Sequence, residues 1–155
     1  MIAIYAISNN GYMARGPNDD MSWTSSLDKK IFNLLTTAFG DCVSSKTSYH
    51  LLPQKMRDDP MRNIYIAERT GKKSLVELNR RNPKIVLIGG PTILKAAYDL
   101  NILHTIIVTK VKIDIMGDPK YKDPLADVLK NQNPKRIDFG DIVVSIYKMQ
   151  YGPQK

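Results

Sequence analysis

Ile2-Ala3-Ile4-Tyr5-Ala6-Ile7 opens the chain as an unbroken apolar run. A run of this kind is typical of a β-strand buried on both faces of a parallel sheet. Asn9-Asn10-Gly11 ends the run. The hydrophobic period then changes to that of a helix that stops at Gly40, with a predicted core face made of Leu27, Ile31, Leu34, Leu35 and Ala38. The sequence therefore predicts a buried strand followed by a covering helix.

Further strands alternate with short helices along the rest of the chain. Strands are predicted at 42–43, 63–67, 84–88, 103–111 and 142–147, and helices at 47–52, 75–80 and 92–100. Such alternation predicts an α/β fold with a mostly parallel central sheet that helices cover on both faces. A long polar stretch separates the last two strands, so we expect these two to pair antiparallel at one edge of the sheet.

Length and composition fit one domain. The chain has 155 residues, of which 43% are hydrophobic and 25% charged, so we expect a single domain over 1–155. Cys42 is the only cysteine, which excludes a disulfide-stapled scaffold. No apolar stretch approaches the roughly 20 residues that cross a bilayer, and no basic leader precedes the first strand. We expect a soluble, cytoplasmic monomer without a membrane partner.

The charge balance is strongly basic. Lys and Arg number 23 against 15 Asp and Glu, which gives a net charge of +8. This balance indicates an anionic partner: nucleic acid, an acidic membrane surface or a phosphorylated small molecule. The sequence lacks an aromatic and basic motif of the RNA-binding type, which argues against nucleic acid. His50, His104 and Cys42 do not have the spacing of metal ligands, so no metal is expected.

Asp28 stands on the apolar face of the first predicted helix, one turn before Phe32. A buried carboxylate is costly unless it is paired, so Asp28 is a candidate anion for a cationic or amide-bearing ligand. Ser25-x-x-Asp28 also matches a capping box, which is a purely structural interpretation. From local sequence alone, the structural interpretation is the more common one.

Two other features suit an anionic ligand. Ile88-Gly89-Gly90-Pro91-Thr92 lies at a strand-to-helix junction, where glycines allow close approach and a helix start offers donors to phosphate. It is not a G-x-G-x-x-G fingerprint, and a tight turn explains it equally well. The second feature is a basic run after the third strand, consisting of Arg69, Lys72, Lys73, Arg80, Arg81 and Lys84. With Lys46 it forms either an anion pocket or a solvated surface, and the solvated surface is the commoner case.

The order and spacing of these features resemble dihydrofolate reductase. An N-terminal strand that contains Ala6 leads into a loop closing on Met21-Ser22-Trp23, and Asp28 follows the tryptophan by five residues. The remaining matches, in chain order, are Lys46-Thr47, Pro60-Met61-Arg62, Ile88-Gly89-Gly90, Thr109 and Gly117-Asp118-Pro119-Lys120-Tyr121. The resemblance runs from Met1 to about Tyr151. It implies the three-layer α/β fold of that family, with an antiparallel C-terminal edge on a mostly parallel sheet.

The resemblance also implies a reaction: reduction of 7,8-dihydrofolate to 5,6,7,8-tetrahydrofolate by hydride transfer from NADPH, within one-carbon metabolism and nucleotide biosynthesis and sensitive to antifolates. Asp28 is implied to bind the amidine-like edge of the pterin, with Thr109 bracing it, and Trp23 to belong to a loop that closes over the nicotinamide. These three are the implied catalytic residues. The other implied substrate contacts are Ala6, Ile7, Phe32, Leu52, Arg57 and Arg62, with the α-carboxylate of the glutamate tail assigned to Arg62.

NADPH is the implied cofactor. The glycine pair, joined by an expected cis peptide, is implied to meet it, and Lys46 and Thr47 to hold its phosphates. The full set of implied cofactor contacts is Ala6, Gly16, Met21, Ser45, Lys46, Thr47, Glu68, Arg69, Ile88, Gly89, Gly90, Pro91 and Thr92.

The chain departs from the family pattern at several places, which include Ser22 in place of Pro and Leu94 in place of an aromatic residue. Ser44-Ser45 stands where the family has Gly and a basic residue that grips the 2′-phosphate. Glu68 stands where the family often has Ser, and an acid there would accept a bond from a free ribose 2′-hydroxyl, which makes NADH the alternative cofactor. Arg69 and the neighbouring lysines favour NADPH. Met61 replaces Gly before Arg62; if it shifts Arg62 by one position, Arg57 reaches in instead.

Two other functions compete with this one. A pyrimidine reductase of the same fold would lack the spacing from Trp23 to Asp28. A catalytically weak or inactive protein of this fold, with a binding or structural role, is kept open by Ser22 and Ser44-Ser45. Binding of nucleic acid would show an affinity that falls steeply with salt, which a reductase does not require.

Overall fold

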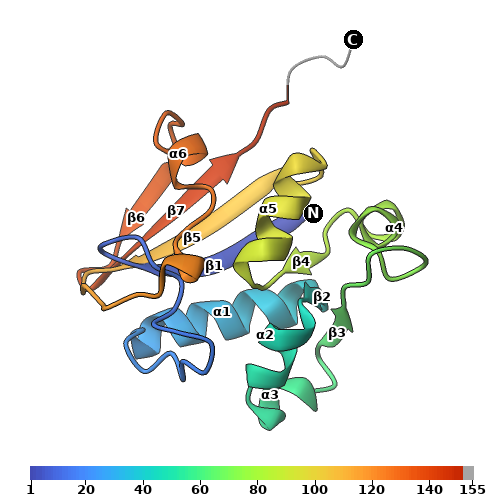
Figure 1. Ribbon diagram of the computed structural model, residues 1–155, viewed down its shortest axis with the longest axis horizontal. Coiled ribbons are helices and arrows are strands. Elements are labelled where there is room, and N and C mark those ends of the chain that lie inside the picture. Colours follow the sequence, from blue (N-terminus) through green and yellow to red (C-terminus); the bar gives the residue numbers. More distant parts are fainter. Residues whose placement is uncertain (152–155) are drawn as a thin grey trace.

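The computed structural model describes residues 1–151 and consists of one mixed β-sheet with helices on both faces (Figure 1). Seven strands lie in the order β3-β2-β4-β1-β5-β7-β6. Their bounds are β1 Ile2–Ser8, β2 Asp41–Ser44, β3 Asn63–Ile66, β4 Val86–Leu87, β5 Thr105–Val111, β6 Lys135–Asp138 and β7 Ile142–Lys148. The α/β class expected from the sequence is confirmed. The end of the domain expected over 1–155 lies outside the described residues.

The strand β1 lies at the centre of the sheet, parallel to both of its neighbours, β4 and β5. On the far side β2 runs parallel to β3 and β4, whereas β7 runs antiparallel to β5 and β6. The expected antiparallel pairing of the last two predicted strands is thus confirmed. In the β1–β5 ladder Ala6 is the register partner of Thr109, so these two side chains share a face of the sheet.

Two apolar cores lie on opposite faces of the sheet. Helix α1, Ser26–Phe39, covers one face together with Trp23. The other face is covered by α4, Leu75–Arg81, α5, Pro91–Asp99, and α6, Ala126–Leu129. Three short elements, α2 Lys46–Leu51, α3 Gln54–Arg57 and the 3-10 helix η1 Pro119–Tyr121, complete the described chain.

The predicted core face of α1 is partly wrong. Leu34 is 66% exposed and Ala38 is also exposed, whereas Thr36 and Asp28 are buried. The buried stripe follows the i,i+4 row of Asp28, Phe32 and Thr36, which turns it away from Leu34. A prediction from hydrophobicity alone places the buried face of α1 on the leucines, because it never assigns a polar residue to the core. The helix therefore buries two polar side chains against the sheet.

The strand predictions were also incomplete. The fourth predicted strand is reduced to Val86–Leu87, and β6 was not predicted at all. All four residues of β6 are exposed, because this strand forms an edge of the sheet, so it lacks the hydrophobic alternation that marks a half-buried strand. The short helices α3 and α6 have four residues each and leave no periodic signal.

Gly117 packs against Tyr12 where the loop after β1 meets the segment after β5. A Cβ added at position 117 would lie 2.1 Å from Cγ of Tyr12. We expect Gly117→Ala to lower the free energy of unfolding by about 1–3 kcal/mol, because overpacking forces the tyrosine or the backbone to move. Denaturant unfolding measures this loss. Gly16→Ala is the control, since no atom lies within 4 Å of the added Cβ; equal stability of the two variants would contradict the packing argument.

Candidate active site

Asp28 is a buried carboxylate in the first turn of α1. The residue is 8% exposed. Burial raises the pKa of its carboxyl above the ordinary value, while a side-chain hydrogen bond from Thr109 and the charge of Lys29 act in the opposite direction. Within residues 1–151 no ion pair includes Asp28. A ligand that brings a cation or paired N–H donors would relieve the cost of this buried charge.

Three more of the predicted residues gather with Asp28 on the face that α1 covers. Ala6 and Thr109 lie side by side on β1 and β5, and Thr109 is 3% exposed. Phe32 follows Asp28 by one helical turn and packs against the core on this face. Ile7 differs, because its side chain packs against the core on the opposite face.

Ser25 forms the N-cap of α1. Its Oγ accepts a hydrogen bond from the backbone N–H of Asp28 at 3.0 Å. The reverse half of a capping box, from the Ser25 N–H to the Asp28 carboxylate, is absent among the hydrogen bonds of the described residues. The cap therefore uses the backbone at position 28 and leaves the carboxylate to face Thr109. Capping explains Ser25, but it does not explain an acid at position 28.

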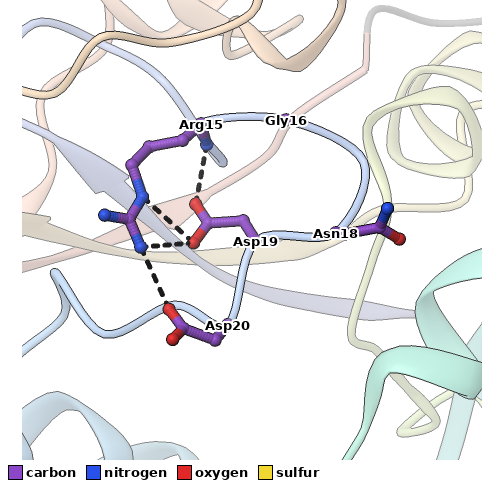
Figure 2. A pocket seen from close by; sticks show the side chains of 5 residues that line it. All are labelled: Arg15, Gly16, Asn18, Asp19 and Asp20. Atoms are coloured by element: carbon purple, nitrogen blue, oxygen red, sulfur yellow. Dashed lines mark hydrogen bonds and ion pairs between the residues drawn. The ribbon is translucent and has the colours of Figure 1, made fainter.

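The loop before α1 holds Trp23 through a carboxylate that the sequence analysis missed. The indole Nε1 of Trp23 donates to Asp19 Oδ2 at 2.9 Å. Arg15 donates to the other oxygen of Asp19 through Nε at 3.2 Å and Nη2 at 3.0 Å, and its Nη2 also reaches Asp20 at 3.0 Å (Figure 2). The predicted closing loop is therefore built around the Asp19 side chain.

Backbone hydrogen bonds join this loop to the segment after β5. The N–H of Asp118 donates to Arg15 O at 3.1 Å, and the N–H of Met13 donates to Tyr121 O at 2.7 Å. Met21 has a φ of 60°, a left-handed conformation that is uncommon for a residue other than glycine. Its N–H donates to Asp19 Oδ1 at 2.9 Å. The loop is thus held at its base by η1 and at its tip by Asp19.

We expect Asp19→Asn to lower the free energy of unfolding by about 1–2 kcal/mol at pH 7. Burial alone would raise the pKa of this carboxyl, but hydrogen bonds from Arg15, Met21 and Trp23 outweigh it and lower the pKa from 3.8 to about 2. Because the folded pKa is lowered, the stabilisation is present above about pH 4 and is lost as the pH falls toward 2. Denaturant unfolding at several pH values measures the difference between the two proteins; a difference that stays constant down to pH 3 contradicts this assignment.

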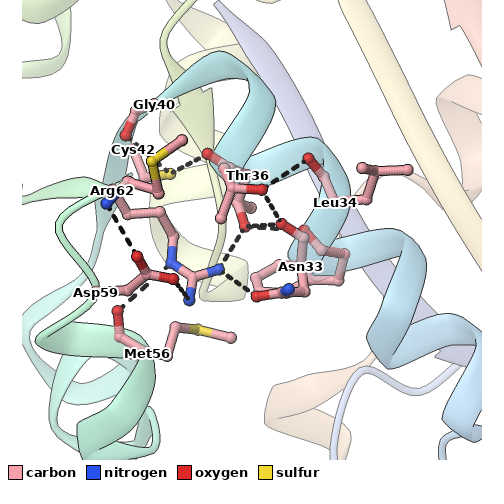
Figure 3. Close-up of polar contacts among 11 residues, drawn as sticks. Asn33, Leu34, Thr36, Gly40, Cys42, Met56, Asp59 and Arg62 are labelled. Atoms are coloured by element: carbon pink, nitrogen blue, oxygen red, sulfur yellow. Dashed lines mark hydrogen bonds and ion pairs between the residues drawn. The ribbon is translucent and has the colours of Figure 1, made fainter.

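Arg62, which the resemblance assigns to the tail carboxylate, is buried beneath α1 (Figure 3), with a side chain that is 3% exposed. Its Nη1 donates to Asn33 Oδ1 at 2.6 Å and to Thr36 Oγ1 at 3.1 Å. Its Nη2 donates to Asp59 Oδ2 at 3.2 Å, and its Nε to Met56 O at 3.4 Å. Four of the five guanidinium N–H donors are therefore engaged within the chain.

The turn before Arg62 accommodates Met61 without a left-handed residue. The N–H of Arg62 donates to Asp59 O at 3.1 Å, and the N–H of Met61 donates to Asp59 Oδ1 at 2.9 Å. Asp at the first position and Pro60 at the second suit a β-turn in which all residues keep a negative φ. Met61 is not among the residues of positive φ. The departure from Gly thus changes the turn rather than breaking it.

Arg57 is the last residue of the short helix α3, and Leu52 precedes that helix. The Arg57 guanidinium lies over the Tyr49 ring, 5.7 Å from its centroid, and Arg57 Nε is buried without a hydrogen-bond partner among the described residues. Leu52 follows α2 and is half-buried. Both predicted substrate residues therefore lie on the α2–α3 segment.

The predicted glycine pair lies at the carboxyl end of β4, next to the start of α2. The Gly89–Gly90 peptide bond is cis, as the resemblance implies. The N–H of Ser45 donates to Gly89 O at 2.8 Å, which ties the turn after β2 to the glycines. A Cβ on Gly90 would lie 3.0 Å from Ser48 Oγ, so the space that glycine leaves is filled by Ser48.

Two helix starts near the glycine pair carry four more of the predicted cofactor residues, which are Lys46, Thr47, Pro91 and Thr92. α5 begins at Pro91, and its N-cap Gly90 has no side chain, so the N–H of Thr92 stands in a first turn without a side-chain cap. Lys46 and Thr47 are exposed in the first turn of α2. Ile88, before the glycines, packs against the core on the α1 face. Backbone donors with an adjacent lysine match the phosphate groups of a dinucleotide in their chemistry.

The loop after β3 carries an acid among several bases. Glu68 and Arg69 are both exposed. The N–H of Glu68 donates to Lys73 O at 2.9 Å, and Arg81 Nη2 donates to Lys72 O, so the loop is closed at its base. Glu68 suits a free ribose hydroxyl, and Arg69, Lys72 and Lys73 suit a phosphate. Features that favour NADPH and NADH therefore stand in the same loop.

Two cavities among the described residues have linings that do not include Asp28. The first, of about 400 Å³, is formed by the loop before Trp23 and is lined by Arg15, Gly16, Asn18, Asp19 and Asp20 (Figure 2). The second, of about 220 Å³, lies on the opposite face of the sheet, between Ile7 and Asp123. Neither lining contains Asp28 or Thr109. The burial and the charge of Asp28, rather than either of these cavities, therefore support its chemical role.

Asp123 is a second buried carboxylate, and its surroundings differ from those of Asp28. It is also 8% exposed, and burial raises its pKa. Its Oδ1 accepts bonds from the Tyr5 hydroxyl at 3.1 Å and from the Leu125 N–H at 2.9 Å. Tyr5 belongs to the core opposite α1. Asp123 is thus bonded to two donors of its own chain and lies on the other face of the sheet.

The missed residues Asp19, Asp59 and Asn33 all act as acceptors for a predicted residue. Asp19 lies four residues after Arg15, and Asp59 three residues before Arg62, so their spacing is the only signal that sequence offers.

In the range 1–151 no group of three or more His, Cys, Asp and Glu is placed to hold a metal ion. None of the helices described is both long and apolar enough to cross a membrane.

No protein-family model matches this chain, and no curated protein matches it. The chemistry of the site must therefore be inferred from its residues, their geometry and their order along the chain.

Proposed function

We propose that this protein reduces 7,8-dihydrofolate to 5,6,7,8-tetrahydrofolate with NADPH. The Asp28 carboxylate carries the proposal: it is buried, it has no ion-pair partner among the described residues, its pKa is raised by burial, and it faces Thr109. The amidine-like edge of a pterin offers adjacent N–H donors that would satisfy both oxygens in a charge-assisted pair. The mostly parallel sheet with an antiparallel C-terminal edge agrees with the fold that the resemblance implies.

The residues around Asp28 have distinct roles in this reaction. When bound, NADPH supplies a hydride to C6 of the dihydropterin. The negative charge of Asp28 favours protonation of the pterin at N5, because it stabilises positive charge on a ring held against it. The Thr109 hydroxyl, whose interaction with the carboxyl lowers the pKa of Asp28, would orient that carboxylate. The loop that carries Met21 and Trp23 would exclude water from the reacting carbons, and the Asp19 contacts hold that loop together.

We propose NADPH rather than NADH as the cofactor. The loop after β3 offers three cations, Arg69, Lys72 and Lys73, against the single acid Glu68. A 2′-phosphate adds negative charge to the dinucleotide, and this excess of cations favours it. Initial rates with each cofactor at equal concentration test the choice. We expect a rate with NADPH that is at least about tenfold higher, from one added charge-assisted contact; comparable or faster turnover with NADH would overturn it.

Binding of a diaminopyrimidine antifolate tests the proposed role of Asp28 without requiring turnover. The ligand presents the same amidine-like edge as the pterin, and the single tryptophan, Trp23, offers a fluorescence signal. We expect Asp28→Asn to weaken binding at pH 7 by about a hundredfold or more, because a buried charge pair loses one partner.

Asp123→Asn is the matched control for this binding experiment. It replaces a carboxylate of the same exposure and with a pKa raised by the same cause, on the other face of the sheet. An asparagine oxygen can still accept from the Tyr5 hydroxyl, so we expect wild-type binding. Equal affinity of wild type and Asp28→Asn would show that the pterin edge is not bound at Asp28. A wild type that neither binds the antifolate nor oxidises NADPH would favour a non-catalytic protein of this fold.

A further inference from the structure

Arg62 already holds a carboxylate of its own chain. Asp59 Oδ2 lies 3.2 Å from Arg62 Nη2, and Asn33 Oδ1 lies 2.6 Å from Nη1 (Figure 3). A guanidinium grips a carboxylate by two parallel N–H donors on neighbouring nitrogens. Both N–H groups of Nη1 are engaged, by Asn33 and Thr36, and the Nε–H is directed at Met56 O. A carboxylate could bind Arg62 through Nη1 and Nη2 or through Nε and Nη2, and each of these pairs therefore contains a donor that is already used.

Burial closes the guanidinium to a second anion. The Arg62 side chain is 3% exposed, whereas that of Asp59 is 28% exposed, so the acid is the member of the pair that solvent reaches. Thr36, another partner of Arg62, is completely buried. A substrate carboxylate would have to displace Asn33 or Asp59 and would meet the like charge of Asp59 as it arrived.

The local chain fixes Asp59 in this position before any ligand binds. Its Oδ1 accepts the Met61 N–H at 2.9 Å, while its Oδ2 meets Arg62, so both carboxylate oxygens are used. The Asp59 backbone carbonyl also accepts the Arg62 N–H at 3.1 Å. The ion pair is thus built into one turn, and no distant rearrangement is needed to form it.

We infer that Arg62 is a structural cation, that Asp59 takes the place of a substrate carboxylate on it, and that the site accepts dihydropterins without needing an anionic tail. This inference rests on the proposed function and names its substrate class. Recognition then lies in the ring edge held by Asp28. The glutamate of dihydrofolate contributes little to the specificity constant kcat/KM.

Arg57 is the competing residue for a tail carboxylate. Its guanidinium lies over Tyr49, and its Nε is buried with no hydrogen-bond partner among residues 1–151. If Arg57 held the tail, dihydrofolate would be preferred strongly over a pterin without glutamate, and Arg57→Ala would abolish that preference. Both results can be measured alongside the main test.

The test compares dihydrofolate with 7,8-dihydropteroate, which lacks the glutamate, in NADPH oxidation assays. For wild type we expect the two kcat/KM values to agree within about threefold, as for a contact exposed at the rim of a site. Asp59→Asn removes the internal charge and keeps an acceptor for the Met61 N–H. We expect it to favour dihydrofolate by about tenfold or more through a lower KM, because Arg62 then lacks a carboxylate.

Asp58→Asn is the matched control, since Asp58 is the adjacent exposed acid and has no ion pair within the described part of the chain. It should leave the ratio of kcat/KM values unchanged. A wild-type preference for dihydrofolate of about tenfold or more that Asp59→Asn does not alter would overturn the inference, as the tail would then be bound by an unoccupied cation.

Binding without NADPH separates this inference from the proposed reaction. Quenching of Trp23 fluorescence by folate and by pteroate gives two dissociation constants for each variant. Similar constants for wild type, with a gain for folate in Asp59→Asn, support the inference even if neither dihydropterin is reduced, and only the reductase proposal then fails. If neither compound binds, both the inference and the proposed function are wrong.

Discussion

Asp28→Asn is expected to lower kcat/KM for NADPH-dependent reduction of dihydrofolate by about three orders of magnitude at pH 7. Asparagine keeps the size of the side chain but removes the charge that would favour protonation of the pterin at N5. It also replaces one acceptor oxygen by a donor, which opposes the donors of the pterin edge. Steady-state rates of NADPH oxidation over a range of dihydrofolate concentrations give the loss and divide it between kcat and KM.

The same substitution is expected to leave the protein at least as stable as the wild type at pH 7. Burial raises the pKa of Asp28, so the folded state binds its proton more readily than the unfolded state. Stability therefore falls as the pH rises from the ordinary pKa of 3.8 toward the folded pKa, and the cost is fully present at higher pH. Asparagine carries no such cost and retains the backbone bond to Ser25 Oγ.

Denaturant unfolding of wild type and Asp28→Asn at pH 7 checks this second half of the prediction. If Asp28→Asn loses activity but keeps the wild-type free energy of unfolding, Asp28 is a functional carboxylate, because residues of functional sites commonly lower the stability of the fold. A loss of about 1 kcal/mol or more in the free energy of unfolding would instead match the effect of a lost helix cap. That outcome would indicate that Asp28 has a purely structural role at the start of α1.

Arg62→Met is expected to lower the free energy of unfolding by about 3–4 kcal/mol at pH 7. The substitution removes the donors that satisfy Asn33, Thr36 and Asp59 and leaves their oxygens without these bonds. Thr36 is completely buried, so water cannot replace the lost donor there. Methionine fills a similar volume, which limits the loss from packing. Denaturant unfolding gives the magnitude.

Arg57→Met is the matched control for that variant. Arg57 is half-buried, lies over Tyr49 and forms no ion pair among the described residues. We expect a loss below about 1 kcal/mol, the size of an exposed cation–π contact. If Arg62→Met unfolds with the wild-type midpoint and only raises the KM for dihydrofolate, then Arg62 binds the tail and is not a structural cation.

The element order could be read from the sequence because most elements have one strong hydrophobic period. The continuous apolar run at Ile2–Ser8 and the long β-branched run in β5 mark buried strands without help from the rest of the chain. The edge strand Lys135–Asp138 could not be read in this way, since it is wholly exposed. Its pairing depends on β7, a partner that only the folded sheet supplies.

The sequence predicted those site residues that stand out by residue type. It did not predict those that a loop or a turn brings into place. Asp28 stands out as an acid on an apolar helix face, and Thr109 as a hydroxyl within a β-branched strand. Their meeting also requires α1 to turn its polar row of Asp28 and Thr36 toward the sheet, which hydrophobicity does not indicate.

The acceptors Asp19 and Asp59 could not be assigned because each lies in an irregular segment. Asp19 reaches Trp23, Arg15 and the backbone of Met21 only in one loop conformation. Asp59 meets Arg62 because the turn between them brings the side chains together. An i,i+3 or i,i+4 spacing outside a helix carries no such expectation. The contacts made by these acceptors therefore differ from those expected for the predicted residues, most of all for Arg62.

We propose that Asp28 anchors a dihydropterin for reduction by NADPH, and the loss of NADPH absorbance on adding 7,8-dihydrofolate is the decisive test of this function. We expect oxidation that depends on dihydrofolate, forms one tetrahydrofolate for each NADPH consumed, and is slower by about three orders of magnitude in Asp28→Asn but not in Asp123→Asn. A rate with the wild-type protein no higher than in the protein-free mixture, at any pH from 5 to 8, would contradict the claim.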